Sequence, residues 1–230
     1  MIPSLYPTVS ENFMPNRQDG LLPPEGSIWR GSTMEDVISG HTAGSWSGVD
    51  PHVFEDVYDV PLHIYRTFRN KSNWEIKTEA KWIEEGGILF YSIQLDTWAP
   101  YAKGAGKDDE IKKFAKGVKA VAPAKVMLPV GYEADLYIPE TQTNGKKIRG
   151  TTDDYKAMWA NFVRIFEEEG ADNVVWVMDY SVKIREHFDV AEKLWPENNV
   201  VQWLFFNLFQ SDVVTKDDGD CAGMFNSIYD

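Results

Sequence analysis

Lys125–Val126–Met127–Leu128–Pro129–Val130–Gly131–Tyr132–Glu133–Ala134–Asp135 is the stretch that decides the fold class of this chain. Residues 126–130 are apolar almost without interruption, as in a strand that is covered on both faces. Gly131 ends the run, and Glu133 and Asp135 follow directly. Ligands and chemistry gather at the carboxyl ends of strands in parallel α/β folds. The stretch therefore predicts a buried strand that delivers two carboxylates to a functional edge.

The rest of the chain alternates short apolar segments with amphipathic ones. The predicted strands cover 27–31, 62–68, 88–93, 126–130, 173–178 and 200–208, and the predicted helices cover 51–58, 74–85, a segment starting near Asp108, and 151–170. Such alternation implies a parallel sheet with right-handed crossovers. Residues 1–26 contain five prolines and are predicted to be an irregular lead-in, which leaves 27–230 as one domain.

About six strand–helix units fit either an open doubly wound sheet or most of a (β/α)8 barrel. No Gly-x-Gly-x-x-Gly follows a predicted strand, and no phosphate-binding Gly-x-x-x-x-Gly-Lys-Ser/Thr is present. The absence of these two motifs argues against a nucleotide-binding doubly wound fold. We predict an α/β protein of the (β/α)8 barrel type that is incomplete.

Composition restricts the partners of this chain. The net charge is −13, which argues against nucleic acid and anionic membranes as partners, because their phosphates need Lys and Arg. No apolar run is long enough to span a membrane, and the N-terminus lacks the pattern of a signal peptide. Aromatic residues make up 13% of the chain, and such rings stack on the C–H faces of sugars. A neutral ligand, such as a polysaccharide or oligosaccharide, fits these properties.

Metal and thiol chemistry find little support in the sequence. The four histidines have no metal-ligand spacing, and a single cysteine, Cys221, cannot form an intrachain disulfide. We expect neither a metal nor an organic cofactor.

Several segments together resemble glycoside hydrolase family 26, which contains mainly β-mannanases, with some xylanases and glucanases. They are Gly131–Tyr132–Glu133–Ala134–Asp135, Tyr155–Lys156–Ala157–Met158–Trp159, Asn173–Val174–Val175–Trp176–Val177, and the segment 201–209. The resemblance implies a (β/α)8 barrel, an extracellular location, and a role for Glu133 as general acid/base at the end of the fourth strand. Hydrolysis would then need no cofactor, because two carboxylates suffice.

The chain departs from that family at two points. Tyr132 stands where the mannanases have a His, so the sugar remains open between mannan and glucan types. The family places its nucleophilic Glu on a seventh strand, and no apolar run ending in Glu follows Phe209. We therefore expect a fragment or a degenerate barrel whose nucleophile is not in this chain. Its open edges are expected to promote self-association.

Other polar and aromatic residues follow the predicted strands and are candidates for substrate binding. Asp135 is expected to orient Glu133 or to bind a sugar hydroxyl. The remaining candidates are Tyr132, Arg66 after the second strand, Asp96, Trp98 and Tyr101 after the third, and Asp179 and Tyr180 after the fifth. For Trp98 and Tyr101, burial in the core is the competing interpretation.

Three functions remain open from the sequence. The leading one is a retaining glycoside hydrolase that acts on an uncharged β-linked polysaccharide. The second is a carbohydrate-binding relative without catalysis. The third is a polysaccharide lyase with Tyr132 or Tyr137 as base, which the acidity of the chain disfavours for uronate-rich substrates.

Overall fold

The computed structural model describes residues 31–33, 56, 63–70, 74–76, 80–141, 147–181, 184, 187–197 and 200–207. These residues form one parallel sheet of six strands in the order β1-β2-β3-β4-β5-β6. The strands are β1 (Gly31–Thr33), β2 (Ile64–Asn70), β3 (Ile88–Gln94), β4 (Val126–Leu128), β5 (Val174–Ser181) and β6 (Trp203–Asn207). The predicted α/β class and parallel sheet are confirmed.

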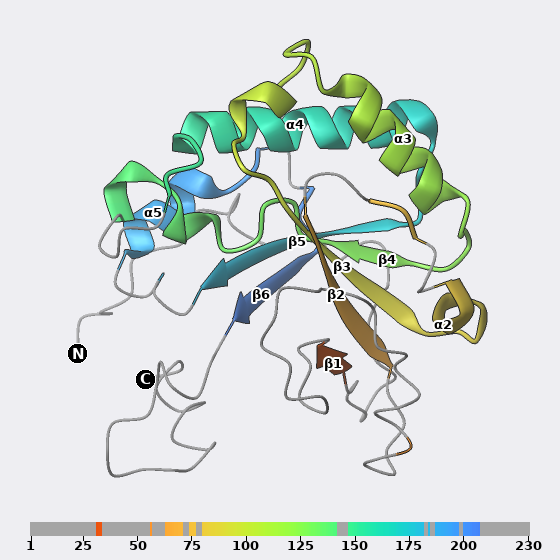
Figure 1. Cartoon of the computed structure of the whole chain (residues 1–230). Helices are drawn as coiled ribbons and strands as arrows, with labels where there is room; N and C mark the ends of the chain where they lie inside the picture. Colours follow the sequence, from red (N-terminus) through yellow and green to blue (C-terminus); the bar gives the residue numbers. More distant parts are fainter. Residues whose placement is uncertain are drawn as a thin grey trace, which may run out of the picture.

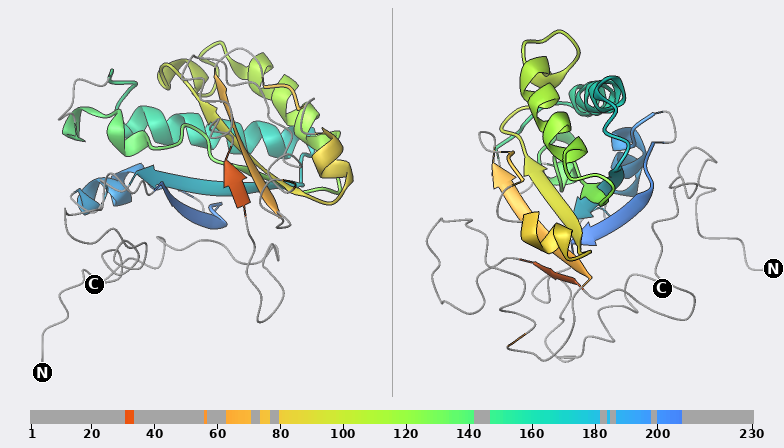
Figure 2. Two further views of the ribbon diagram at one scale, coloured as in Figure 1. Left: turned by 60° about the horizontal axis from the view of Figure 1, so that its bottom comes forward. Right: turned by 90° about the vertical axis from the view of Figure 1, so that its right-hand side faces the viewer.

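Four α-helices that lie within the described residues accompany the sheet (Figure 1). They are α2 (Ala80–Glu84), α3 (Asp108–Lys119), α4 (Thr152–Glu169) and α5 (Phe188–Leu194). Short 3-10 turns follow β3 (Ala99–Tyr101) and β4 (Ala134–Leu136 and Pro139–Thr141). The helices α3 and α4 contact each other and lie on the same side of the sheet in all views (Figure 2).

The two faces of the sheet carry different cores, because side chains alternate along each strand. On the helix side, Leu89, Val126 and Trp176 join a large apolar cluster with residues of all four helices. On the opposite face, a smaller cluster contains Phe90, Met127, Val175 and Val177, with Ile64, Ile88, Trp203 and Phe205 packed against it. Strands in sequential order with helices on one face form a singly wound sheet, and not the doubly wound alternative.

The helix α4 begins and ends where the sequence predicts. Thr151 and Asp154 form a reciprocal capping box, in which the Asp154 amide donates to the Thr151 hydroxyl at 3.1 Å. Gly170 ends the helix in the left-handed conformation, with φ of 68°. Local sequence chemistry is therefore sufficient to fix this helix.

Several predicted boundaries differ from the structure. The helix predicted for 74–85 is shorter, because Trp74 packs as non-helical chain against the rings of Tyr101, Phe114 and Phe162. The strand β4 ends at Leu128, since Pro129 has no N–H for the ladder.

The ends of the sheet also differ from the prediction. The strand β1 is described over Gly31–Thr33, beyond the predicted end at Gly31, and β6 starts at Trp203 instead of at residue 200. The predicted lead-in 1–26, the strand start 27–30 and most of the predicted helix 51–58 lie outside the described residues, as does 208–230.

Candidate functional site

The segment after β4 forms the centre of the candidate site, at the carboxyl edge of the sheet. Gly131 turns the chain with φ of 65°, and a side chain there would lie 3.2 Å from Tyr155 and 3.3 Å from Trp98. Only glycine meets both demands, so this turn is specified by the sequence. It brings the next residues over the end of β5.

Glu133 is held in an unusual backbone conformation at this edge. Its φ of 53° and ψ of 39° lie in the left-handed region, and no other non-glycine residue of the described chain has a positive φ. Its amide donates to the carbonyl of Asp179 at 2.9 Å, and its side chain is partly exposed. Such strain persists only where the surroundings impose it, and it is concentrated at functional sites.

Asp135 fastens the same turn to the end of β5. Its side chain is buried and accepts hydrogen bonds from the amide of Ser181, at 3.0 Å, and from the Ser181 hydroxyl. The Thr141 hydroxyl donates to its carbonyl oxygen. Both oxygens of the Asp135 carboxylate thus have partners on β5, and its expected role, to orient Glu133 or to bind a sugar hydroxyl, stays a prediction.

Arg66 ties four strands together on the face opposite the helices. It donates to Ser92 on β3 at 2.9 Å, to Asp179 on β5 at 2.6 Å and to Asn207 on β6 at 2.5 Å. Asn207 in turn donates to the second carboxylate oxygen of Asp179 at 2.6 Å. Both charged side chains are almost completely buried, at 4% and 0% exposure. Burial raises the pKa of Asp179, while the Arg66 guanidinium acts in the opposite direction.

Two tyrosines flank Glu133, and both are poor candidates for a base. Burial raises the pKa of Tyr132 to about 12, and its ring packs edge-on against Phe68 at 5.4 Å. Burial also raises the pKa of Tyr137, although Arg149 opposes the shift. A phenol needs a lowered pKa to act as a base near neutral pH, so these environments disfavour the lyase.

Gln94 and Arg149 also belong to this edge, and the sequence analysis did not identify them. Gln94 ends β3 and donates from its amide nitrogen to the carbonyl of Tyr132 at 3.3 Å. Arg149 lies over the ring of Tyr137, with 3.8 Å from the guanidinium carbon to the ring centre. Its backbone bridges two loops, accepting from the Trp98 amide at 3.1 Å and donating to the Tyr137 carbonyl at 2.8 Å. No sequence signal marks Arg149, because it comes from a segment far beyond the end of a strand.

The structure places the other predicted binding residues mostly in the interior. Trp98 is completely buried and packs against Tyr155, with 5.0 Å between ring centres, so it offers no open face for stacking. Tyr101 is also a core residue, and Tyr180 donates to the carbonyl of Ala191 at 2.6 Å. Asp96 is exposed on the loop after β3. Core burial, the alternative considered for Trp98 and Tyr101, agrees with these positions.

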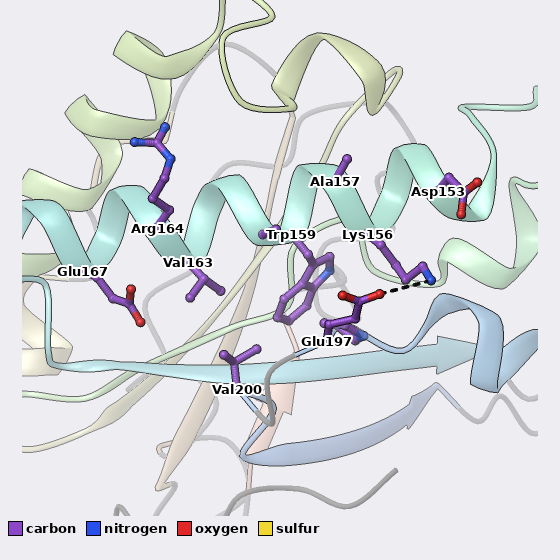
Figure 3. Close-up of a pocket in the computed structure, with 11 residues that line it drawn as sticks. Asp153, Lys156, Ala157, Trp159, Val163, Arg164, Glu167, Glu197 and Val200 are labelled. Atoms are coloured by element: carbon purple, nitrogen blue, oxygen red, sulfur yellow. Dashed lines mark ion pairs between the residues drawn. The ribbon is translucent and has the colours of Figure 1, made fainter. Parts of the chain in front are cut away.

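A groove on the helix side is separate from this edge (Figure 3). It runs between α4 and the chain before β6, and Lys156 pairs with Glu197 across it at 3.8 Å. Trp159, Val163 and Val200 line its apolar part. No residue predicted for catalysis or binding lines this groove.

In the part of the chain that the structure describes, no group of His, Cys, Asp and Glu side chains is arranged to hold a metal ion. None of the helices described there has the length and apolar character needed to cross a membrane.

Comparison with known proteins gives a weak structural likeness and no sequence relative. No protein-family model matches the chain, and no curated protein matches its sequence. Among solved structures, a GH26 β-mannanase from Bacteroides ovatus, BoMan26A, aligns with a TM-score of 0.46 and 11% identity. The alignment covers 65% of this chain and 54% of the mannanase chain, so this chain spans about half the length of that structure. What the fold and the edge define is a parallel α/β protein with a strained acidic residue at the carboxyl edge of its sheet.

Proposed function

We propose that this chain is a retaining glycoside hydrolase for an uncharged β-linked polysaccharide of the mannan or glucan type, with Glu133 as the general acid/base and a nucleophile that lies outside the described residues. The observation that carries the proposal is the strained backbone of Glu133, which is bonded to the end of β5 and holds a partly exposed carboxyl group at the carboxyl edge. The surrounding side chains are polar and aromatic, as a sugar site requires. The six strands would form part of a (β/α)8 barrel within 27–230.

In this proposal, Glu133 donates a proton to the glycosidic oxygen as the bond from the anomeric carbon to that oxygen breaks. A second carboxylate bonds to the anomeric carbon and holds the sugar as an ester. Glu133 then takes a proton from water, the water oxygen attacks the anomeric carbon, and the ester bond breaks. Retaining enzymes place their two carboxyl groups roughly 5–5.5 Å apart.

Neither buried aspartate is assigned as the nucleophile. Asp135 is bonded to Ser181, and Asp179 is bonded to Arg66 and Asn207. An attacking carboxylate needs an oxygen directed at the substrate, and these oxygens already have partners. The proposal therefore assigns no nucleophile within the described residues.

The same observation supports a second candidate, a carbohydrate-binding protein without catalysis. Such a protein would keep the polar edge and need no second free carboxylate. The lyase loses support, because burial raises the pKa of both tyrosines.

A product assay separates these functions. The protein is incubated with mannan, glucomannan, mixed-linkage β-glucan and xylan, and with polymannuronate as a substrate that a lyase can cleave, and new reducing ends and the ultraviolet absorbance of an unsaturated product are followed. Hydrolysis gives reducing ends without absorbance, and a lyase gives both. Retention on an affinity gel without any product supports the binding protein instead.

A further inference from the structure

Arg149 is a half-buried cation without an anionic partner in the part of the chain that the structure describes. Its contact is with the face of Tyr137, and its Nη1 atom is buried without a hydrogen-bond acceptor. A buried donor without an acceptor destabilises the folded protein, so such groups call for an explanation. A ligand group that accepts a hydrogen bond is one explanation.

Within the described ranges of the chain, Gln94 has a buried hydrogen-bond acceptor without a donor, whereas Arg149 has a buried donor without an acceptor. Its side chain is 8% exposed, and its Oε1 atom has no hydrogen-bond donor among the described residues, while its amide nitrogen bonds to Tyr132. The buried carbonyl oxygen needs a donor. A ligand that both donates and accepts would satisfy Gln94 and Arg149 together.

The two side chains meet at Tyr137, although they come from different segments. Arg149 covers the ring of Tyr137, and the Gln94 side chain reaches its phenol. Glu133 is also close enough to act electrostatically on both Tyr137 and Arg149. The unsatisfied donor and acceptor therefore lie beside the candidate acid.

We propose that Gln94 and Arg149 form a subsite for a neutral sugar ring with neighbouring hydroxyl groups. One hydroxyl donates to Gln94 Oε1, and the same or the adjacent hydroxyl accepts from Arg149 Nη1. The location of this subsite rests on the proposed function, but binding to it does not require hydrolysis.

The local charge favours a neutral ring over a uronate. Asp96 and Glu133 act on Arg149, so its positive charge is already offset. Asp135 and Asp179 add further carboxyl groups beside this edge, and among the buried charged residues of the described chain Arg66 is the cation that accompanies them. A sugar carboxylate would meet this acidic surrounding, whereas hydroxyl groups would not be repelled.

The test measures binding in the absence of turnover. Titration calorimetry with Glu133→Gln uses mannohexaose, cellohexaose and xylohexaose, with hexamannuronate as the acidic counterpart of mannohexaose. We expect at least one neutral hexaose to bind more tightly than hexamannuronate. Adding Arg149→Met or Gln94→Met is expected to weaken that binding at least tenfold. Lys147→Met replaces an exposed residue two positions before Arg149 and is expected to leave the binding of the hexaose unchanged.

Three results would overturn the subsite: no binding of any neutral hexaose at millimolar concentration, tighter binding of hexamannuronate, or binding that neither substitution weakens. Circular dichroism melting establishes that each variant is folded, and if Arg149→Met does not fold, Gln94→Met decides. Binding that depends on both residues, without any hydrolysis by the unmodified chain, would support the subsite and contradict only the proposed hydrolysis.

Discussion

The amide of Glu133 donates to the carbonyl of Asp179 at 2.9 Å and thereby fastens the turn after β4 to the end of β5. The bond forms while Glu133 occupies the left-handed region, with φ of 53°. In the same turn, the carboxylate of Asp135 accepts a hydrogen bond from the amide of Ser181, which also lies on β5. The turn is thus fixed on both sides, and the Glu133 side chain is placed by the backbone.

The backbone strain at Glu133 predicts an unusual ranking of variants. Glu133→Gly is expected to be more stable than Glu133→Ala by about 1 kcal/mol, because glycine adopts a positive φ without steric cost. Urea denaturation of both variants measures the difference. The exposed Glu140 provides the control, since at an ordinary position glycine is expected to be the less stable of the two. Equal stabilities of the two Glu133 variants would show that no strain is stored there.

The buried pair of Arg66 and Asp179 predicts a large loss of stability on Arg66→Met. Removing one partner of a buried pair costs about 3–5 kcal/mol, whereas Lys193→Met, which removes an exposed pair with Asp189, is expected to cost far less because solvent screens that pair. Thermal and urea unfolding measure both. Similar losses for the two variants would contradict the structural role of Arg66.

The same variant predicts a pH dependence. The pKa of Asp179 is raised by burial, and losing Arg66 should raise it further. A carboxyl group with a raised folded-state pKa stabilises the protein below its unfolded pKa, and that contribution is lost as the pH rises through the folded pKa. Both proteins should therefore lose stability in parallel up to the folded-state pKa of Asp179 in the unmodified chain, about 8, and the stability gap between them should widen only above that pH. A difference in stability that does not widen at any pH would contradict this prediction.

Burial of Tyr132 predicts a second pH effect, at alkaline pH. Its pKa rises from 10.0 to about 12, so the folded state holds the phenolic proton more tightly than the unfolded state. The resulting stabilisation is complete below pH 10 and is lost between pH 10 and 12. Stability should fall more steeply over that interval in the unmodified chain than in Tyr132→Phe. Parallel curves would show that this phenol titrates normally.

The open edges of the sheet predict concentration-dependent self-association. Among the described residues, β1 and β6 each pair with one neighbouring strand, and Phe206 on β6 is 36% exposed. Sedimentation velocity over a range of concentrations should reveal oligomers. Phe206→Lys should weaken them, because lysine protects strand edges, while Phe188→Lys on α5 should not. A monomer at every concentration would contradict this prediction.

The sequence predicted those parts of the fold that depend on local chemistry. The capping box at Thr151 and the left-handed Gly170 fixed α4, and the apolar runs located the strands. The helix at 74–85 was predicted too long, because the burial of Trp74 among distant aromatic rings leaves no local signal. Propensity cannot anticipate such tertiary contacts.

The candidate site was predicted less completely than the fold. Arg66, Asp179 and Glu133 were identified from their predicted places at strand ends. The structure instead places Arg66 inside β2, near the start of that strand, and its long side chain reaches Asp179 across the sheet. Asn207 and Arg149 were missed. Asn207 lies on β6 and completes the hydrogen-bond network of Arg66 and Asp179, which only the folded sheet brings together. Arg149 does not follow a strand, so its position in the sequence gives no signal. Trp98 and Tyr101 share the loop position of binding residues, but their size makes them core residues.

The most direct test of the central claim compares the release of reducing ends by three proteins: the unmodified chain, Glu133→Gln and Glu140→Gln. The substrate is the neutral polysaccharide that the chain binds most tightly. The substitution to Gln keeps the shape of the side chain and removes its ability to transfer a proton. The account predicts activity that falls about 10²- to 10⁴-fold in Glu133→Gln and is unchanged in Glu140→Gln, with both variants folded and still binding the polysaccharide. Undiminished activity in Glu133→Gln would contradict the assignment of Glu133 as the acid/base, whereas binding without any activity in the unmodified chain would contradict the proposed hydrolysis itself.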